Sequence, residues 1–330
     1  MREIAKRVVL SSLYTLGTVG RMLHLSRLSY KVTRNISPFP LLLRKLIDYS
    51  TPVDPLASTA SVPKIELCIP CTEKDMALLP TVVLSAVMNS NNKISSIRIV
   101  VPPVQVEAFQ KYLGEDFDHL NLTVVSESAL LGDLISLCSS VTPSSRRGWL
   151  IQQVVKFMCV LTSTEDGVLI LDADTLITRP RTWLQDNHSQ ILMISEEFHD
   201  PYQHHFVKFQ TSLKPELLAR DNPRVSFVTH HQLMQPVFLR EMFGGDSIWK
   251  LGLESWIKAV DFSSNSPACE YHCYGTFMVT KKPKQICFAR WGNVAVPRVD
   301  PRVSNQNFNL VTLQTEFPKS LSVSMHAYLS

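Results

Sequence analysis

The feature that most constrains the fold is an apolar stretch that ends in two carboxylates. Residues 168–171 are four consecutive large aliphatic side chains, and Asp172, Ala173 and Asp174 follow directly. Such a run predicts a strand buried on both faces, as found inside parallel sheets. Open α/β sheets bind ligands at the carboxyl ends of these strands, so Asp172 and Asp174 are expected to face a ligand. Their hard oxygens suit Mg²⁺ or Mn²⁺ shared with substrate phosphates, and capping or structural carboxylates are the alternative.

Other apolar runs predict a sheet of which this strand is one member. Strands alternate with helices, which is typical of βαβ units and predicts an α/β fold with a mostly parallel sheet flanked by helices. The expected strands span residues 65–70, 97–101, 122–125, 168–171 and 191–194; the expected helices span 76–88, 104–113, 150–161, 236–242 and 248–260, with a helix or strand up to 279.

The positive charge is concentrated at the amino-terminal end. Residues 1–50 contain nine Lys and Arg against Glu3 and Asp48, so the remainder is slightly acidic and no nucleic-acid-binding body is indicated. The longest uncharged stretch there has 13 residues, too short for a bilayer span, which needs about 20. We expect residues 1–50 to form a basic amphipathic helix on an anionic cytoplasmic membrane surface, or else a helix packed on the body. Residues 51–63 are rich in Pro and Ser and are expected to be a linker.

Cysteine and glycine usage excludes several classes of protein. Seven scattered cysteines in a long, 45% apolar chain do not resemble a secreted disulfide framework, and a reducing, cytoplasmic location is expected. Cys68-x-x-Cys71 is a redox or zinc half-site by spacing, but no second such pair follows, and buried apolar roles are the default. Neither a Gly-x-Gly-x-x-Gly nor a Walker loop occurs, which argues against dinucleotide oxidoreductases and P-loop enzymes.

Two further groups of polar residues are expected near the two acids. The loop after the first strand carries Thr72, Lys74 and Asp75, which are placed to meet a base, ribose or phosphate; a solvated turn explains them equally well. The helix before Asp172 carries Gln152, Gln153 and Lys156 on a broad polar surface. Lys156 would neutralise phosphate if that helix covers the site, and otherwise the three form a solvated face.

Several motifs follow one another along residues 64–330. They are Ile69-Pro70, Gly148-Trp149, Gln152-Gln153-x-x-Lys156, Leu171-Asp172-Ala173-Asp174-Thr175, Val228-Thr229-His230-His231 and Glu270-Tyr271-x-x-Tyr274-Gly275. In this order the motifs resemble glycosyltransferases of the GT-A fold, a Rossmann-like α/β fold. They are also similar to an uncharacterised bacterial family of candidate polysaccharide glycosyltransferases.

The resemblance implies a metal-dependent transferase that moves a sugar from a nucleotide-diphosphate donor to a saccharide or lipid-linked saccharide. It implies that Asp172 and Asp174 hold Mn²⁺ or Mg²⁺. A histidine near the carboxyl end of several such families implies a metal role for His326, and a buried or surface histidine without a metal role is the alternative. A donor half at about 64–180 and an acceptor half at about 181–330 follow from it. Such an enzyme is expected to serve polysaccharide biosynthesis, peripherally on the inner face of the membrane. The donor-binding residues implied are Pro70, Thr72, Lys74, Asp75, Trp149, Gln152, Gln153, Lys156, Asp172 and Ala173.

An inverting transferase also needs a general base from the acceptor half. Glu270 is the candidate, since it is a lone acid that precedes an aromatic-flanked element, and a helix-capping role is the alternative. Asp246 and His231 are the next candidates. Two other functions stay open: a haloacid-dehalogenase-type phosphatase with Asp172 as nucleophile and Asp174 as acid/base, and a catalytically inactive sugar-binding homologue.

Overall fold

The structure is a computed structural model that describes residues 62–114, 117–185, 188–195, 199–209, 226–264, 266–289, 291–298, 310–318 and 320–326. The basic segment predicted at 1–50, and most of the linker predicted at 51–63, lie outside these residues.

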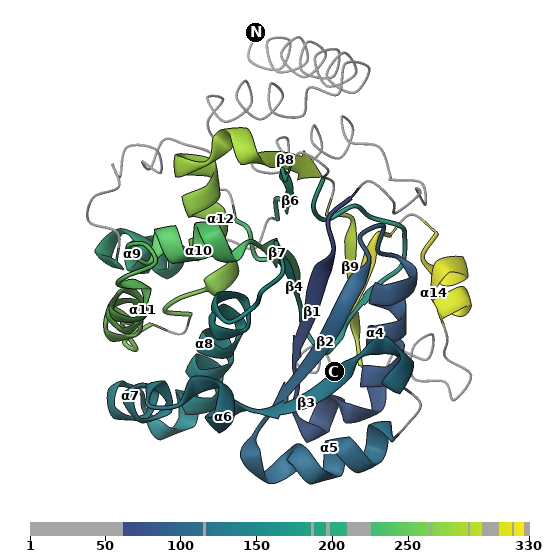
Figure 1. Ribbon diagram of the computed structural model, residues 1–330, viewed down its shortest axis with the longest axis horizontal. Coiled ribbons are helices and arrows are strands. Elements are labelled where there is room, and N and C mark those ends of the chain that lie inside the picture. Colours follow the sequence, from purple (N-terminus) through teal and green to yellow (C-terminus); the bar gives the residue numbers. More distant parts are fainter. Residues whose placement is uncertain are drawn as a thin grey trace, which may run out of the picture.

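A five-stranded sheet forms the centre of the molecule (Figure 1). Its strand order is β3-β2-β1-β4-β7, with four parallel strands and β7 antiparallel to β4 at one edge. This confirms the predicted α/β fold with a mostly parallel sheet. The strands are β1 (Ile65–Pro70), β2 (Ile94–Val101), β3 (Leu122–Ser126), β4 (Val168–Leu171) and β7 (His231–Met234).

The apolar run of β4 is buried on both faces, as predicted. Val168 and Ile170 belong to one hydrophobic cluster, while Leu169 and Leu171 belong to another. The first cluster includes helices α8 (Arg147–Leu161) and α12 (Glu270–Lys281), and the second includes α4 (Leu79–Met88) and α5 (Val106–Leu113). Figure 1 shows α4 and α5 on one side of the sheet and α8 and α12 on the other. Because side chains alternate along a strand, Asp172 continues the α8-facing row of Val168 and Ile170.

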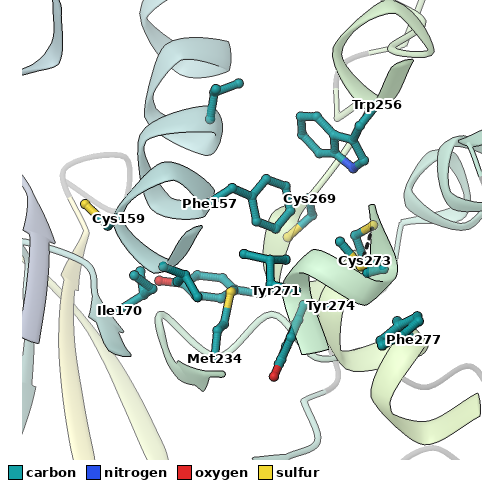
Figure 2. Close-up of a cluster of buried hydrophobic side chains, with 14 of the residues drawn as sticks. Phe157, Cys159, Ile170, Met234, Trp256, Cys269, Tyr271, Cys273, Tyr274 and Phe277 are labelled. Carbon is teal, nitrogen blue, oxygen red and sulfur yellow. Dashed lines mark hydrogen bonds between the residues drawn. The ribbon is translucent and has the colours of Figure 1, made fainter. Parts of the chain in front are cut away.

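The helical side has an aromatic core of its own (Figure 2). The ring of Phe157 on α8 packs edge-to-face on Phe243 and Trp256, with centroids 5.2 and 5.1 Å apart. Edge-to-face contacts of this kind add stability beyond the buried area. The helices that complete this side are α6 (Glu127–Leu131), α7 (Leu134–Val141), α9 (Asp200–Phe209), α10 (Pro236–Met242) and α11 (Trp249–Lys258).

A three-stranded sheet brings the last part of the chain back to the end of β4. Its order is β5-β10-β9, where β5 (Thr175–Ile177) follows directly on Asp174, β10 is Ser322–His326 and β9 is Asn293–Pro297. Ser324 on β10 pairs with Thr175 on β5, and the Met325 amide donates to the Asp174 carbonyl oxygen at 2.8 Å. The remaining elements are the pair β6 (Gln190–Met193) and β8 (Ile286–Ala289), and helix α14 (Leu310–Glu316).

Some elements differ from the sequence expectations. The helix expected at 76–88 starts as a 3₁₀ turn, Glu73–Leu78, and continues as α4. The segment from Glu270, left open between helix and strand, is helix α12. Strand β7 and helix α9 were not predicted, because His231 and Gln232 interrupt the apolar pattern of β7 and α9 carries polar side chains in its middle. None of the described helices is long and apolar enough to span a membrane.

Candidate active site

Asp172 lies at the carboxyl end of β4 and faces α8, where the sequence placed it. Its backbone amide donates to the His230 carbonyl oxygen at 2.9 Å, and its own carbonyl oxygen accepts from Thr175 at 3.0 Å. These two bonds end the strand and turn the chain into β5. The side chain is 19% exposed and therefore lies at the edge of the buried core.

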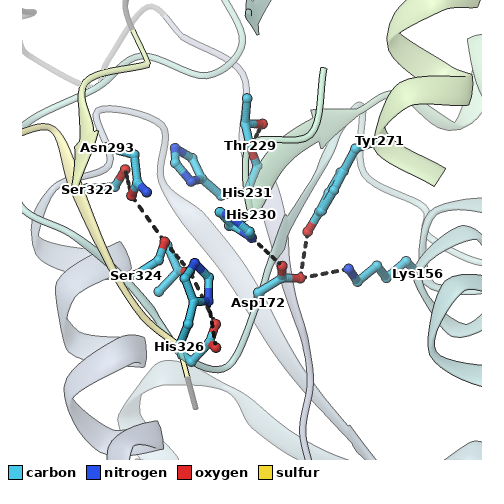
Figure 3. A network of polar contacts seen from close by, with 12 residues as sticks. Lys156, Asp172, Thr229, His230, His231, Tyr271, Asn293, Ser322, Ser324 and His326 are labelled. Atoms are coloured by element: carbon cyan, nitrogen blue, oxygen red, sulfur yellow. Dashed lines mark hydrogen bonds and ion pairs between the residues drawn. The ribbon is translucent and has the colours of Figure 1, made fainter. Parts of the chain in front are cut away.

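Three groups hold the Asp172 carboxylate in place (Figure 3). Lys156 Nζ lies 2.7 Å from Oδ1, and Tyr271 Oη donates to the same oxygen at 2.9 Å. His230 Nδ1 lies 3.3 Å from Oδ2. Burial alone would raise the pKa of Asp172, but the Lys156 ammonium and His230 lower it well below its usual range. Asp172 is therefore ionised, and burial keeps the pKa of Tyr271 so far above its ordinary value that Tyr271 stays a neutral donor.

Lys156 is a buried cation shared between two carboxylates. Its Nζ lies 2.6 Å from Glu270 Oε1 as well as 2.7 Å from Asp172 Oδ1, and it sits 4.3 Å from the centre of the Tyr271 ring. Burial would lower the pKa of Lys156, but the two carboxylates raise it above its ordinary value, so the ammonium is charged. An ammonium has three N–H donors, and two carboxylates and a ring face already surround it. Lys156 therefore holds Asp172 instead of presenting a free charge to phosphate.

Glu270, the candidate base, lies inside the protein at the first position of α12. Its side chain is 1% exposed; Oε1 faces Lys156, and Oε2 is buried without a hydrogen-bonding partner among the residues that the structure describes. Burial raises the pKa of Glu270, although Lys156 opposes the shift. The Glu270 amide donates to Gln153 Oε1 at 3.2 Å, so the buried Gln153 side chain satisfies one of the free N–H groups at the amino terminus of α12. These contacts argue against Glu270 as a base that meets an acceptor hydroxyl.

Asp174 is paired with His326 on the neighbouring strand. Asp174 Oδ2 lies 3.5 Å from His326 Nδ1, and the rings of His326 and His230 are 4.8 Å apart (Figure 3). His230 precedes β7 and has φ 60°, a left-handed backbone conformation that non-glycine residues seldom adopt. Strain of this kind often marks a functional position. The structure thus brings together three residues that the sequence proposed for metal binding, Asp172, Asp174 and His326, and adds His230.

These side chains fit a divalent metal ion as two donor pairs. No three His, Cys, Asp or Glu side chains form a ready-made metal cluster in the described ranges, so water or substrate oxygens would have to complete the shell. Neighbouring ligands of an octahedral ion lie about 3 Å apart, because metal–oxygen distances are about 2.1 Å. The distance from Asp172 Oδ2 to His230 Nδ1 is 3.3 Å, and that from Asp174 Oδ2 to His326 Nδ1 is 3.5 Å; both are close to this value.

The loop after β1 lies beside this site through an arginine that the sequence did not single out. Arg298, just after β9, donates to Asp75 Oδ1 and to the Lys74 carbonyl oxygen, the latter at 3.0 Å. Its amide also donates to the His326 carbonyl oxygen at 3.4 Å. Arg298 therefore connects the predicted donor loop, in which Asp75 is buried and the Lys74 side chain is 69% exposed, to the strand that carries His326.

The other predicted donor residues lie around the same edge. Pro70 ends β1 and is buried, Thr72 precedes the 3₁₀ turn, and Ala173 is buried between the two acids. Trp149 and Gln152 are half-buried on the first turns of α8, where the Trp149 ring lies 6.3 Å from that of Phe262. The structure places these residues at the carboxyl end of the sheet or on the helix that covers it.

Two candidate bases lie elsewhere. His231 is on the opposite face of the sheet from Asp172, 1% exposed, with its ring 5.5 Å from that of Trp183. Burial lowers the pKa of His231 well below its ordinary value, so it is a neutral core histidine. Asp246 lies in the turn between α10 and α11, its side chain 86% exposed and 3.7 Å from Arg240. Of the adjacent histidines, His230 is therefore the one at the site, because its ring lies beside Asp172 whereas the His231 ring lies against Trp183.

A family model matches residues 77–298, about two thirds of the chain; its description is a family of unknown function, DUF6492. The chain belongs to DUF6492. The DUF6492 match includes Lys156, Asp172, Asp174, His230 and Glu270, and it ends at Arg298. The loop after β1 and His326 lie outside it.

No curated protein matches this DUF6492 chain in sequence. Among solved structures it is similar to mouse xyloside xylosyltransferase 1, with 11% identity and a TM-score of 0.44 over 81% of this chain and 99% of that one. It is also similar to the galactosyltransferase LgtC in complex with donor and acceptor sugar analogues, with 13% identity and a TM-score of 0.44. This likeness covers 79% of this chain and 87% of that one. Likenesses at this level decide nothing about the activity of the DUF6492 chain.

Proposed function

We propose that this protein is a metal-dependent glycosyltransferase that moves a sugar from a nucleotide-diphosphate donor to a saccharide or a lipid-linked saccharide. The observation that supports this most is the pairing at the end of β4, where Asp172 and Asp174 each lie beside an imidazole contributed by a distant part of the chain. Carboxylates at the ligand-binding edge of a parallel sheet suit an ion that binds a diphosphate. The ordered sequence motifs that resemble GT-A glycosyltransferases point the same way.

In this proposal the residues of the chain mainly position and neutralise. A bound Mg²⁺ or Mn²⁺, held by Asp172 and Asp174 with His326, would offset the charge that develops on the departing nucleoside diphosphate. Lys156 and Tyr271 fix the Asp172 carboxylate in one orientation, which preorganises the site before substrate arrives. Arg298 holds the loop of Thr72, Lys74 and Asp75 next to His326, so that the loop is available for the nucleotide.

The phosphatase alternative has less support. It needs a second pair of acids for the metal beside the nucleophile Asp172. Within the described part of the chain, Glu270 is engaged by Lys156, and Asp246 lies in an exposed turn with Arg240. A catalytically inactive sugar-binding homologue would bind donor without hydrolysing or transferring it.

Thermal stabilisation by a panel of nucleotide sugars, with and without Mn²⁺, tests the proposal directly. We expect one donor class to raise the melting temperature only when the ion is present. Asp174→Asn should abolish this effect and sugar transfer while the chain stays folded, because it removes a charged ligand at a partly exposed position. Asp172→Asn should do the same with some loss of stability, since Lys156 loses one carboxylate. Unchanged turnover in either variant would overturn the metal-site assignment.

We also propose that residues 1–50 attach the protein to the inner face of a membrane. Their nine basic residues support this, since each Lys or Arg near an anionic surface contributes about 1 kcal/mol. This attachment would place the transferase beside lipid-linked acceptors used in polysaccharide biosynthesis.

A further inference from the structure

Two cysteines far apart in the sequence meet between the sheet and the helix that carries Lys156. Cys68 lies in β1 and Cys159 in the last turns of α8, separated by 91 residues. Their Sγ atoms are 2.7 Å apart, and both residues are fully buried. Figure 2 shows Cys159 on the sheet-facing side of α8, close to Ile170 of β4.

The distance between the two sulfurs is shorter than a contact between separate thiols. Non-bonded heavy atoms prefer separations of about 3.5–4.0 Å, while the sulfurs of a disulfide lie about 2.05 Å apart. The fold therefore holds Cys68 and Cys159 closer than two thiols favour and within a small movement of bonding distance.

Neighbouring contacts keep the two elements in this position. Cys68 pairs with Arg98 of β2 in the sheet, and the Arg98 side chain reaches α8, where it donates to the Cys159 carbonyl oxygen and to Thr162 Oγ1, the latter at 2.9 Å. Glu66 on β1 in turn accepts from Arg98. The end of α8 is thus fixed on β1 and β2 by a charged group as well as by the apolar core.

We propose that Cys68 and Cys159 form a disulfide when the chain meets a small-molecule disulfide such as oxidised glutathione. One cysteine thiolate attacks a sulfur of the small disulfide and releases one glutathione thiol. The second cysteine attacks the resulting mixed disulfide and releases the other thiol. The two cysteines lose two electrons and two protons, and the small disulfide is reduced to two thiols.

Burial determines when this reaction takes place. It raises the pKa of Cys68 well above the ordinary value, which disfavours the reactive thiolate in the folded chain. Exchange is therefore fast during folding, before α8 covers β1, and slow afterwards. The bond would join β1 to α8 three residues beyond Lys156 and so tie the helix of the candidate site to the central sheet.

The sequence pair Cys68-x-x-Cys71 is not the pair that the structure brings together. Cys71 Sγ contacts the carbonyl oxygen of Thr72, 3.5 Å away. This gives the experiment a matched control, since Cys71 is also buried and lies on the same tryptic peptide as Cys68.

The test is peptide mapping of the full chain after refolding from guanidinium chloride in a glutathione redox buffer. Free thiols are alkylated in denaturant, and the protein is digested with trypsin without reduction. We expect residues 65–74 to be recovered covalently joined to residues 157–181, with five of the seven cysteines alkylated. Cys71→Ser should leave this cross-link intact, and Cys68→Ala and Cys159→Ala should each remove it.

The oxidised wild-type chain should also melt at a temperature higher by about 5 °C or more than the reduced chain, because the bond closes a long loop. Mapping of the wild-type chain and of Cys71→Ser needs no alanine variant, so it decides the question even if an alanine variant folds poorly. Recovery of both peptides fully alkylated, or a cross-link that Cys71→Ser abolishes, would overturn the proposal.

Discussion

Lys156 Nζ lies 2.7 Å from Asp172 Oδ1 and 2.6 Å from Glu270 Oε1, so one buried ammonium carries two carboxylates from separate parts of the chain. Removing the ammonium with Lys156→Met would leave Glu270 buried without its counter-ion, while Asp172 would keep only Tyr271 and His230. We expect a loss of about 3–5 kcal/mol in the free energy of unfolding, measured with urea. Lys156→Arg keeps the charge and should lose clearly less. A Met variant as stable as the parent would show that the ion pair adds nothing to stability.

Glu270→Gln separates the role of counter-ion from that of general base. The glutamine oxygen still accepts a hydrogen bond from Lys156, and the parent side chain is 1% exposed, so we expect sugar transfer within about tenfold of the parental rate. A general base would instead show transfer at least about 10²-fold slower with donor binding unchanged. That second outcome, measured with matched donor affinities, would restore Glu270 as the base.

The adjacent histidines His230 and His231 should have separable effects. His230→Asn removes the imidazole beside Asp172 and keeps a residue type that tolerates positive φ, so the fold should be retained. We expect Mn²⁺ affinity, measured by calorimetry, to fall about 10–100-fold. His231→Gln should lower stability and leave Mn²⁺ affinity within about twofold, because His231 faces Trp183 in the core. The reverse pattern would place the site on the other face of β7.

Stability should fall as the pH drops from 7.5 to 5. Burial lowers the pKa of His205 and of His272 to about 4 from the ordinary 6.5. Below pH 6.5 the unfolded chain binds protons that the folded chain does not, so this stabilisation is complete above 6.5 and is lost toward pH 4. Between pH 7.5 and 5 each histidine should cost about 2 kcal/mol in the free energy of unfolding, measured from urea midpoints. Burial also lowers the pKa of His231, which therefore contributes in the same direction, and His205→Gln should reduce the loss by about a third. An unchanged pH dependence would contradict this account.

Deletion of residues 1–50 should release the protein from vesicles that contain anionic lipid. Nine basic residues are lost, whereas the candidate site, which starts with the loop after β1, is untouched. Co-sedimentation measures the binding, and donor-dependent stabilisation serves as the control for the folded body. Equal vesicle binding by the shortened chain would rule out this attachment.

The central strand and the ligand-binding edge of the sheet could be predicted from the order of residues along the chain. Val168–Leu171 can be buried on both faces only inside a sheet, and the acids that follow must then lie at its carboxyl end, because strand alternation and the sheet edge are local consequences of chain order. The alternation of strands and helices predicted that β1, β2, β3 and β4 run parallel, because a helix between two strands returns the chain to the same end of the sheet.

The side chains that surround Asp172 could not be predicted from the sequence. They come from separate parts of the fold: Lys156 from α8, His230 from the residue before β7, Glu270 from α12 and His326 from β10. These residues meet because of how the elements pack together, and no local sequence pattern encodes that packing. Packing buried Glu270 against Lys156, which argues against the predicted role as a base. It also placed His230 beside Asp172, whereas His231 lies on the other face of the sheet. Likewise, Cys68 meets Cys159 and not the nearby Cys71, since contact between β1 and α8 is set by the three-dimensional fold.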